Sequence, residues 1–391
     1  MRITQSFLHT LKQHPALPFI TLILSICVVS LNTGLTIPYT TFKLKYLGAS
    51  DFIIGLMAAT PALGIVIMAF FANAIAKRFS IKSLFVASTI LLTLSIMPLA
   101  YLDDFTLIFL LRLTTGIACS LLIILGETCV NDLASDHDRG RIVAIYTTFF
   151  TICQILGPFI LSLLGARSSA ALWLLFAVHL IGLAITCWAP LTFAFHGKQK
   201  HSKSLFYFVR TVPVIILAIF LFAFFDAAVL SIMPLYSIEY GYTEQLAVLI
   251  VSMIFIGDAC FQIPFGWLSD AYGRVRIHVL CAIGTLLLTV MIPFLMPYPI
   301  FLWPTLFLWG GFAGSIYTLG LVRAGDYFTG PNLVAANACL GLVWGLGGLV
   351  APLMSMGLMH YLGSNGLIIG IALMTVLFLL SFGKKISIDA Q

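Results

Sequence analysis

The chain has 391 residues, of which 61% are hydrophobic and 9% are charged. A soluble domain carries roughly a quarter charged residues, so this composition excludes a water-soluble globular protein and predicts a chain that crosses a bilayer repeatedly. The formal net charge of +6 requires no nucleic-acid partner, because anionic inner-leaflet lipid accounts for it.

Twelve apolar stretches are each long enough to cross a bilayer as a helix. The first is too long for a signal-peptide core and no small-residue cleavage site clearly follows it, so it is expected to be retained. The sequence therefore predicts an all-α integral membrane protein with twelve transmembrane helices. In chain order the predicted spans are 17–41, 51–76, 83–101, 105–131, 142–165, 171–196, 207–236, 244–269, 277–296, 299–325, 335–360 and 364–383.

Basic residues predict the orientation of these spans. Most of the 20 lysines and arginines fall on one side of the twelve-span arrangement, whereas Lys43, Lys45 and Arg167 fall on the other. Because positively charged loops stay in the cytoplasm, both termini are predicted to be cytoplasmic. The eight cysteines lie inside apolar segments without a CxxC pair, which favours reduced packing residues.

The chain also repeats its own landmarks at about half its length. Such doubling is typical of transporters in which one half rocks on the other. We therefore expect a six-helix half at 1–196, a cytoplasmic connector at 197–206 and a second six-helix half at 207–391. Three pairs of landmarks share a spacing of 193 to 196 residues: Pro38 with Pro234, the 77–80 loop with 270–273, and Gly157-Pro158 with Ala351-Pro352.

The loop after the eighth predicted span, FGWLSDAYGRVRIH at 265–278, concentrates charge in an apolar chain. Its pattern G-x-x-x-D-x-x-G-R-x-R, with twelve spans in two halves, resembles the major facilitator superfamily over essentially the whole chain. The stretches LNTGLTIPY, DRGRIVAIY and ANACLGLVWGLGGLVAP resemble its bacterial YcaD-like branch. The resemblance implies a transporter of the bacterial inner (plasma) membrane, a monomer that moves a small molecule by alternating access.

The resemblance further implies that the 265–278 loop is a cytoplasmic latch. Gly266 would let two helices approach closely, and Gly273 would permit a tight turn. Asp270 would accept hydrogen bonds from Arg274 or from a helix N-terminus when the cytoplasmic side is shut. The alternative is that the charges only follow the positive-inside rule, which explains the arginines but neither the aspartate nor the glycine spacing. The gating residues predicted are Gly266, Asp270, Gly273 and Arg274, together with Gly157 and Pro158 of the fifth span, which resemble part of an antiporter-associated motif.

A stripe of small and polar residues lies along the fourth predicted span. From Arg112 to Glu127 these residues recur at steps of three and four, so they share one helical face that should line a cavity or pack against a neighbour. Arg112 and Gly116 resemble the superfamily motif whose arginine is implicated in proton transfer in drug antiporters; an anionic cargo is the alternative. Glu127 lies about 22 Å from Arg112 along a helix, too far to pair with it. Glu127 is a proton-site candidate, with an interhelical or interfacial hydrogen bond as the alternative.

Two acids are predicted near the membrane midplane. Asp226 and Asp258 lie 16 residues on either side of a turn near 242, so antiparallel neighbouring helices would place them at similar depth. If they share a pocket, their repulsion favours binding of a proton. They could equally bind a cation or a substrate hydroxyl, or make two unrelated contacts. Gln262 follows Asp258 by one turn, and Asn32 of the first span is a further candidate to line the cavity.

No P-loop, metal-ligand cluster or nucleophile elbow is found, so the sequence predicts neither an enzyme nor a cofactor. Transport must then be driven by an ion gradient or by the gradient of the substrate itself. The expected function is proton-coupled secondary transport of a small molecule, with efflux of drug-like compounds slightly favoured. The alternatives are a proton-coupled importer of a metabolite or siderophore, and a transport-inactive sensor or scaffold.

Overall fold

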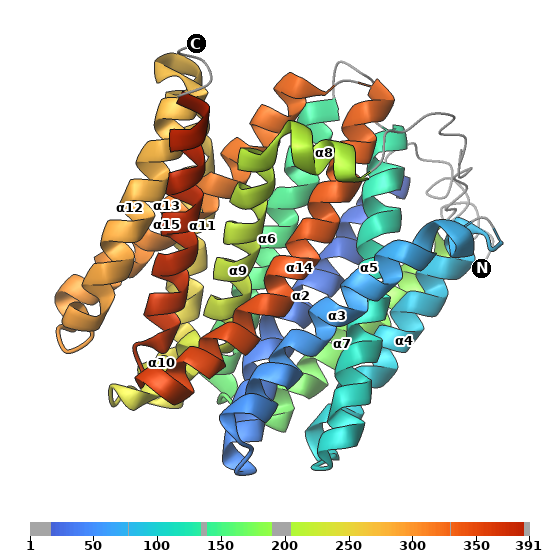
Figure 1. Cartoon of the computed structure of the whole chain (residues 1–391). Helices are drawn as coiled ribbons and strands as arrows, with labels where there is room; N and C mark the ends of the chain where they lie inside the picture. Colours follow the sequence, from blue (N-terminus) through green and yellow to red (C-terminus); the bar gives the residue numbers. More distant parts are fainter. Residues whose placement is uncertain (1–16, 77, 134–138, 190–204, 329, 387–391) are drawn as a thin grey trace. The chain divides into compact units, whose positions relative to one another are not determined.

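The computed structural model describes residues 17–76, 78–133, 139–189, 205–328 and 330–386. These residues form helices joined by turns, without a strand, as hydropathy predicts (Figure 1). The helices are α2 (Leu17–Tyr46), α3 (Asp51–Ala76), α4 (Ile81–Tyr101), α5 (Phe105–Leu133), α6 (Arg139–Leu164), α7 (Ser169–Trp188), α8 (Leu205–Thr211), α9 (Pro213–Ser231), α10 (Met233–Glu239), α11 (Glu244–Tyr272), α12 (Arg274–Leu295), α13 (Pro299–Tyr327), α14 (Gly330–Leu362) and α15 (Gly366–Ile386).

Eleven helices in the described part of the chain are long and apolar enough to cross a membrane. The last helix, α15, carries a further apolar stretch at Gly366–Phe382. Together these twelve segments correspond in order to the twelve spans predicted from hydropathy. The protein is therefore a multi-pass membrane protein.

The seventh predicted span, 207–236, is not one helix but three consecutive helices, α8, α9 and α10. Pro213 is the first residue of α9, and Pro234 lies in the first turn of α10. Proline lacks a backbone N–H and fits the first turn of a helix, where that donor would have no partner within the helix. Each proline therefore begins a new helix inside a continuous apolar run, which hydropathy alone does not reveal.

The contacts divide the chain into two compact units. The first contains residues 1–36, 64–157 and 168–198; the second contains 37–63, 158–167 and 199–391. The second unit thus includes two segments from the first part of the sequence, the 37–63 segment and the 158–167 segment. This division by contacts differs from the division of the sequence into halves at 1–196 and 207–391, which stays a prediction.

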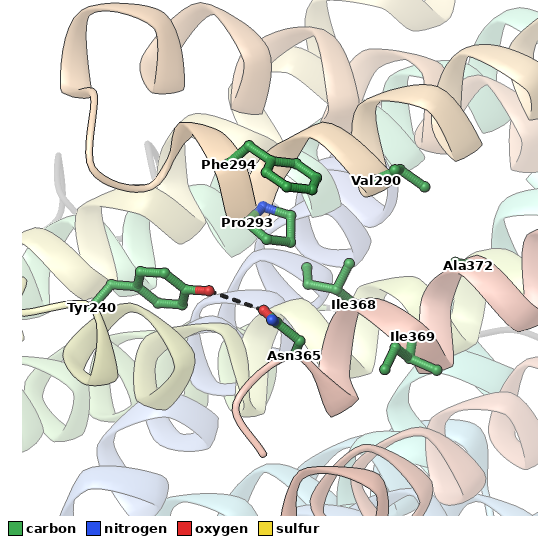
Figure 2. Close-up of a pocket in the computed structure, with 8 residues that line it drawn as sticks. All are labelled: Tyr240, Val290, Pro293, Phe294, Asn365, Ile368, Ile369 and Ala372. Atoms are coloured by element: carbon green, nitrogen blue, oxygen red, sulfur yellow. Dashed lines mark hydrogen bonds between the residues drawn. The ribbon is translucent and has the colours of Figure 1, made fainter. Parts of the chain in front are cut away.

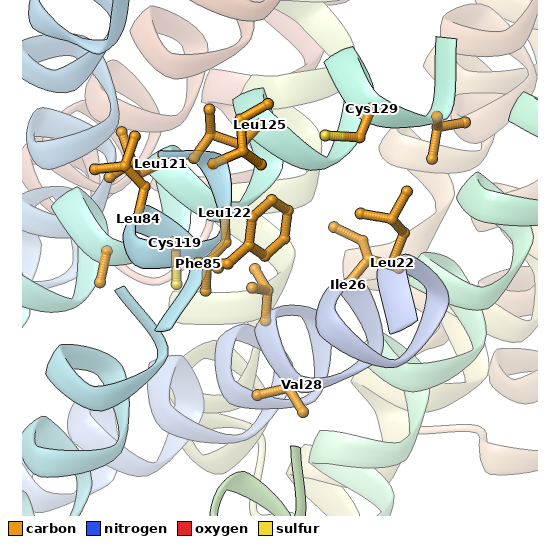
Figure 3. Packing of buried hydrophobic residues seen from close by; sticks show 14 of the residues in the cluster. Leu22, Ile26, Val28, Leu84, Phe85, Cys119, Leu121, Leu122, Leu125 and Cys129 are labelled. Atoms are coloured by element: carbon orange, nitrogen blue, oxygen red, sulfur yellow. The ribbon is translucent and has the colours of Figure 1, made fainter. Parts of the chain in front are cut away.

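The first unit is held together by an apolar core between α2, α4 and α5 (Figure 3). Leu22 and Ile26 of α2, Phe85 of α4, and Leu122 and Leu125 of α5 are all buried within it. Lipid tails are as apolar as these side chains, so close packing and hydrogen bonds must hold the helices together. This core fixes the positions of α2 and α5, the helices that carry Asn32 and Arg112.

In the second unit, α11 and α13 cross in close contact through glycine. A Cβ atom at Gly257 of α11 would overlap the carbonyl oxygen of Phe307, and one at Gly310 of α13 would overlap that of Ile254. Small residues allow helix backbones to approach closely in membranes. The crossing fixes the register of α11, and hence the position of Asp258, which follows Gly257 directly.

Candidate functional site

Arg112 of α5 is buried in the first unit, with 1% of its surface exposed. Its Nη1 atom donates a hydrogen bond to Oγ1 of Thr36 on α2, at 3.0 Å. Its Nε and Nη2 atoms have no hydrogen-bond partner among the described residues. One turn before Thr36, the buried amide of Asn32 directs Nδ2 toward Sγ of Cys119 at 3.9 Å, and its Oδ1 has no partner in the same part of the chain. Arg112 and Asn32 thus contribute unsatisfied polar atoms to one region between α2 and α5.

The remainder of the predicted α5 stripe packs against neighbouring helices. Thr115 donates a hydrogen bond to Oγ of Ser95 on α4, at 3.0 Å. Ser120 donates one to the carbonyl oxygen of Ile65 on α3, at 3.4 Å. Of the two alternatives predicted for this face, packing against a neighbour therefore applies to these residues. At the far end of the stripe, the side chain of Glu127 is exposed.

Asp258 of α11 is closely enclosed by its surroundings. It is 3% exposed, and Nε2 of Gln262, one turn later on α11, donates a hydrogen bond to its Oδ1 at 2.9 Å. A Cβ atom at Gly314 of α13 would overlap the same oxygen. The carboxyl group is therefore held between a neutral amide and the backbone of the neighbouring helix, without a basic partner among the described residues.

Asp226 of α9 is also buried, with 4% of its surface exposed. Asp258 accepts its hydrogen bond from Gln262, on the same helix. The shared carboxylate pocket of Asp226 and Asp258 stays a prediction.

The predicted latch lies where α11 ends and α12 begins. Nη2 of Arg274 lies 3.5 Å from Oδ1 of Asp270, one helical turn away, and both side chains are partly exposed. Gly273 has a φ of +97°, a conformation that side chains of L-residues rarely adopt, and it forms the predicted tight turn. No described atom lies within 4 Å of a Cβ built at Gly266, so the close helix approach predicted there is not observed. The gating roles of these four residues stay predictions.

The second predicted gating group lies in α6. A Cβ atom at Gly157 would overlap the backbone of Gly34 and Leu35 on α2. The glycine therefore permits a backbone-to-backbone crossing of α2 and α6. Pro158 follows inside α6 and is buried. The structure explains why Gly157 is small, and leaves the gating role of both residues a prediction.

An ion pair and a histidine–carboxylate contact within the second unit were not predicted from the sequence. Nε of Arg167, in the turn between α6 and α7, lies 3.1 Å from Oε2 of Glu244 at the start of α11, and its guanidinium covers the ring of Tyr46 at 4.5 Å. Nδ1 of His360, near the end of α14, lies 3.6 Å from Oδ2 of Asp51 at the start of α3. Each pair joins residues more than 75 positions apart, so spacing in the sequence gives no signal for it.

A second buried arginine lies in the second unit. Arg323 of α13 is 5% exposed, its Nη1 lies 3.1 Å from Nδ1 of His278 on α12, and its guanidinium lies 5.7 Å from the ring of Phe382. Its spacing in the sequence from Asp326, three residues later, predicts a local ion pair, and the side chain of Asp326 lies outside the described residues. Arg323 therefore has an aromatic and an imidazole partner, unlike Arg112.

One open groove of about 460 Å³ lies between α12 and α15 (Figure 2). The hydroxyl of Tyr240 donates a hydrogen bond to Oδ1 of Asn365 at its edge, at 3.0 Å. The other lining groups are apolar and the amide oxygen is already bonded, so this groove carries none of the polar candidates above. It is lined by Tyr240, Val290, Pro293, Phe294, Asn365, Ile368, Ile369 and Ala372.

Comparisons with known proteins agree on one family. The profile described as Major Facilitator Superfamily matches residues 22–257 and 215–385. The uncharacterized MFS-type transporter YfkF of Bacillus subtilis is 26% identical over 339 residues, covering 85% of this chain and 86% of its own. The uncharacterized MFS-type transporter YE1530 of Yersinia enterocolitica is 22% identical over 339 residues, with the same coverage.

Solved structures show the same fold. A mutant form of the nucleoside transporter NupG superposes with a TM-score of 0.76 at 16% identity, covering 94% of this chain and 99% of its own. A D-xylose-proton symporter superposes with a TM-score of 0.72 at 19% identity, covering 93% of this chain and 96% of its own. At these identities the likeness establishes the architecture. The substrate must be inferred from the residues of the site.

Proposed function

The chain belongs to the Major Facilitator Superfamily of secondary transporters, and on this premise we propose that it is a proton-coupled symporter that imports a small polar molecule. It would act in the bacterial inner membrane by alternating access, with both termini in the cytoplasm. Asp258 would carry the proton.

The burial of Asp258 is the observation that supports proton coupling. An ionised carboxylate is costly to bury without a positive partner, because a low-dielectric interior solvates charge poorly. Asp258 has only the neutral amide of Gln262 as a hydrogen-bond donor in the described chain. Binding a proton removes the charge and the cost, and access to water restores the ionised form. A site that alternates between burial and water therefore takes up and releases a proton in each cycle.

The burial of Arg112 supports symport over exchange. Asp258 and Arg112 are buried at the same time in this structure. In symport, the proton and a polar cargo are present together, so both buried charges are satisfied in the loaded state. In exchange they are bound in turn, which leaves one unsatisfied charge in each loaded state. A polar cargo moved with the proton gradient is thus favoured over the drug-like cargo that the sequence slightly favoured for efflux.

Reconstitution into liposomes that contain a pH-sensitive dye tests this proposal. Cargo candidates come from a thermal-shift screen of sugars, organic acids, siderophore-like chelators and lipophilic cations, because a ligand of the folded state raises its apparent stability. Adding the cargo should make protons enter with it. Asp258→Asn, which resembles the protonated acid, should abolish proton entry while cargo-for-cargo exchange persists.

Asp103→Asn is the matched control, since it makes the same change at an exposed acid and should leave proton entry unchanged. Proton entry at the normal rate in Asp258→Asn would exclude Asp258 as the carrier. Proton release in response to cargo would identify efflux instead of import. A protein that binds ligands but moves neither cargo nor protons would be the transport-inactive sensor.

A further inference from the structure

The guanidinium of Arg112 is a buried charge whose hydrogen bonding is incomplete. The side chain is 1% exposed, yet two of its three nitrogen atoms have no partner among the described residues. Such a group loses its hydration without replacement, which makes an unpaired buried charge strongly unfavourable. A ligand that supplies the missing acceptors would recover this cost.

Two other buried ionisable residues, Arg323 and Asp258, differ from Arg112 in this respect. Arg323 interacts with the imidazole of His278 and the ring of Phe382. Asp258 accepts a hydrogen bond from Gln262 and becomes neutral on binding a proton. Arginine keeps its positive charge at any physiological pH. Arg112 therefore cannot lose its charge by releasing a proton. A bound anion is the remaining way to compensate that charge.

The unsatisfied atoms of Arg112 have a definite arrangement. Thr36 holds Nη1, which fixes the plane of the guanidinium. Nε and Nη2 form one edge of that plane, and this edge matches the spacing of two oxygen atoms of a carboxylate or phosphate. The amide of Asn32, one turn from Thr36 on α2, has an unpartnered Oδ1. It can accept a hydrogen bond from a hydroxyl or amino group that lies beside the oxyanion.

We infer that the cargo is an organic oxyanion, a carboxylate or phosphate ester, whose charged group binds the Nε–Nη2 edge of Arg112. A polar substituent of the same molecule interacts with Asn32. The inference rests on the proposed function as a transporter and adds the chemical class of its cargo. It predicts that neutral and cationic compounds of the same size bind more weakly than oxyanions.

Binding to the purified full-length protein tests the class of cargo. The probes are lactate, citrate, benzoate, glycerol 3-phosphate and glucose 6-phosphate, with lactamide, benzamide, glycerol and glucose as neutral counterparts and choline as a cation. At least one oxyanion should stabilise the protein against heating, and its neutral counterpart should not. The unfolding temperature then distinguishes carboxylates from phosphate esters, because the preferred class of cargo raises it more.

Arg112→Lys keeps the charge and removes the two-pronged edge. It should weaken binding of the best oxyanion roughly tenfold, the effect of losing one charge-assisted hydrogen bond. Arg112→Gln should weaken it further. Arg323→Lys is the matched control, because it makes the same change at a buried arginine with partners and should leave affinity within about twofold. If Arg112→Gln does not fold, the affinity of Arg112→Lys for the oxyanion still tests the inference.

Oxyanions that bind Arg112→Lys as tightly as the normal protein would overturn the inference, as would stabilisation by the neutral or cationic probes alone. These results are separate from those of the proton assay. Coupled proton entry with a neutral cargo would retain the transporter and refute the oxyanion. Arginine-dependent oxyanion binding without proton movement would retain the site and refute the coupling.

Discussion

The position of Asp258 depends on the contact between α11 and α13, and Gly314→Ala tests this dependence. The added methyl group would occupy the place of Oδ1 of Asp258. Either the carboxyl rotates and loses the 2.9 Å hydrogen bond from Gln262, or the two helices separate at a crossing already closed by Gly257 and Gly310. Overpacking costs typically about 1–3 kcal/mol and a lost hydrogen bond about 0.5–1.5 kcal/mol, whereas alanine regains up to about 1 kcal/mol of helix propensity. Relative to an alanine substitution that meets no neighbouring atom, where the propensity gain is the same, the expected loss is therefore about 0.5–3 kcal/mol.

Equilibrium unfolding in mixed detergent micelles measures this loss, with Gly357→Ala of α14 as the control. No described atom lies within 4 Å of a Cβ at Gly357, so the control should be as stable as the normal protein or slightly more so. Proton entry into liposomes should fall in Gly314→Ala and stay unchanged in the control. Equal stability and equal proton entry in the two variants would refute the view that α13 holds the carboxyl group of Asp258.

Two further predictions concern ion pairs at the helix ends. Asp270→Asn should lower transport while affinity for the cargo in detergent stays within a few-fold of normal, because the residue lies in the predicted latch and not among the proposed cargo contacts. Unaltered transport would exclude a latch role for Asp270. Arg167→Gln and Glu244→Gln, which break the 3.1 Å pair, should each lower stability by about 0.2–1 kcal/mol in low salt. Their double variant should lose less than the sum of the two, and purely additive effects would show that the pair does not couple these positions.

The twelve spans could be predicted from hydropathy because each helix must satisfy its own backbone hydrogen bonds in lipid and present apolar side chains to it. The division of the seventh span could not, since Pro213 and Pro234 are themselves compatible with an apolar run. Their effect arises from a missing N–H and not from polarity. The family was recognisable from the loop at 265–278, and the YcaD-like branch within it stays a prediction.

The candidate residues of the site were predictable as types, because a polar group inside a membrane span is rare without a role. Their partners were not. Thr36 is 76 residues from Arg112, and Gly314 is 56 residues from Asp258, so these contacts depend on how separate helices pack. The shared pocket of Asp226 and Asp258 stays a prediction, because it rests on equal distance from a turn. Equal distance fixes depth along a helix but not the face on which a side chain lies.

The two proposals together determine how transport should respond to membrane voltage. A monovalent oxyanion at Arg112 and one proton at Asp258 carry no net charge, so symport should be driven by a pH gradient and be insensitive to voltage. Exchange of the same anion for a proton would move two charges per cycle in one direction, worth about 4.6 kcal/mol at 100 mV from about 2.3 kcal/mol per charge. Liposomes with a potassium gradient and valinomycin impose voltage without a pH difference. Uptake that follows the pH gradient alone is expected, and transport driven strongly by voltage would contradict electroneutral symport and indicate exchange.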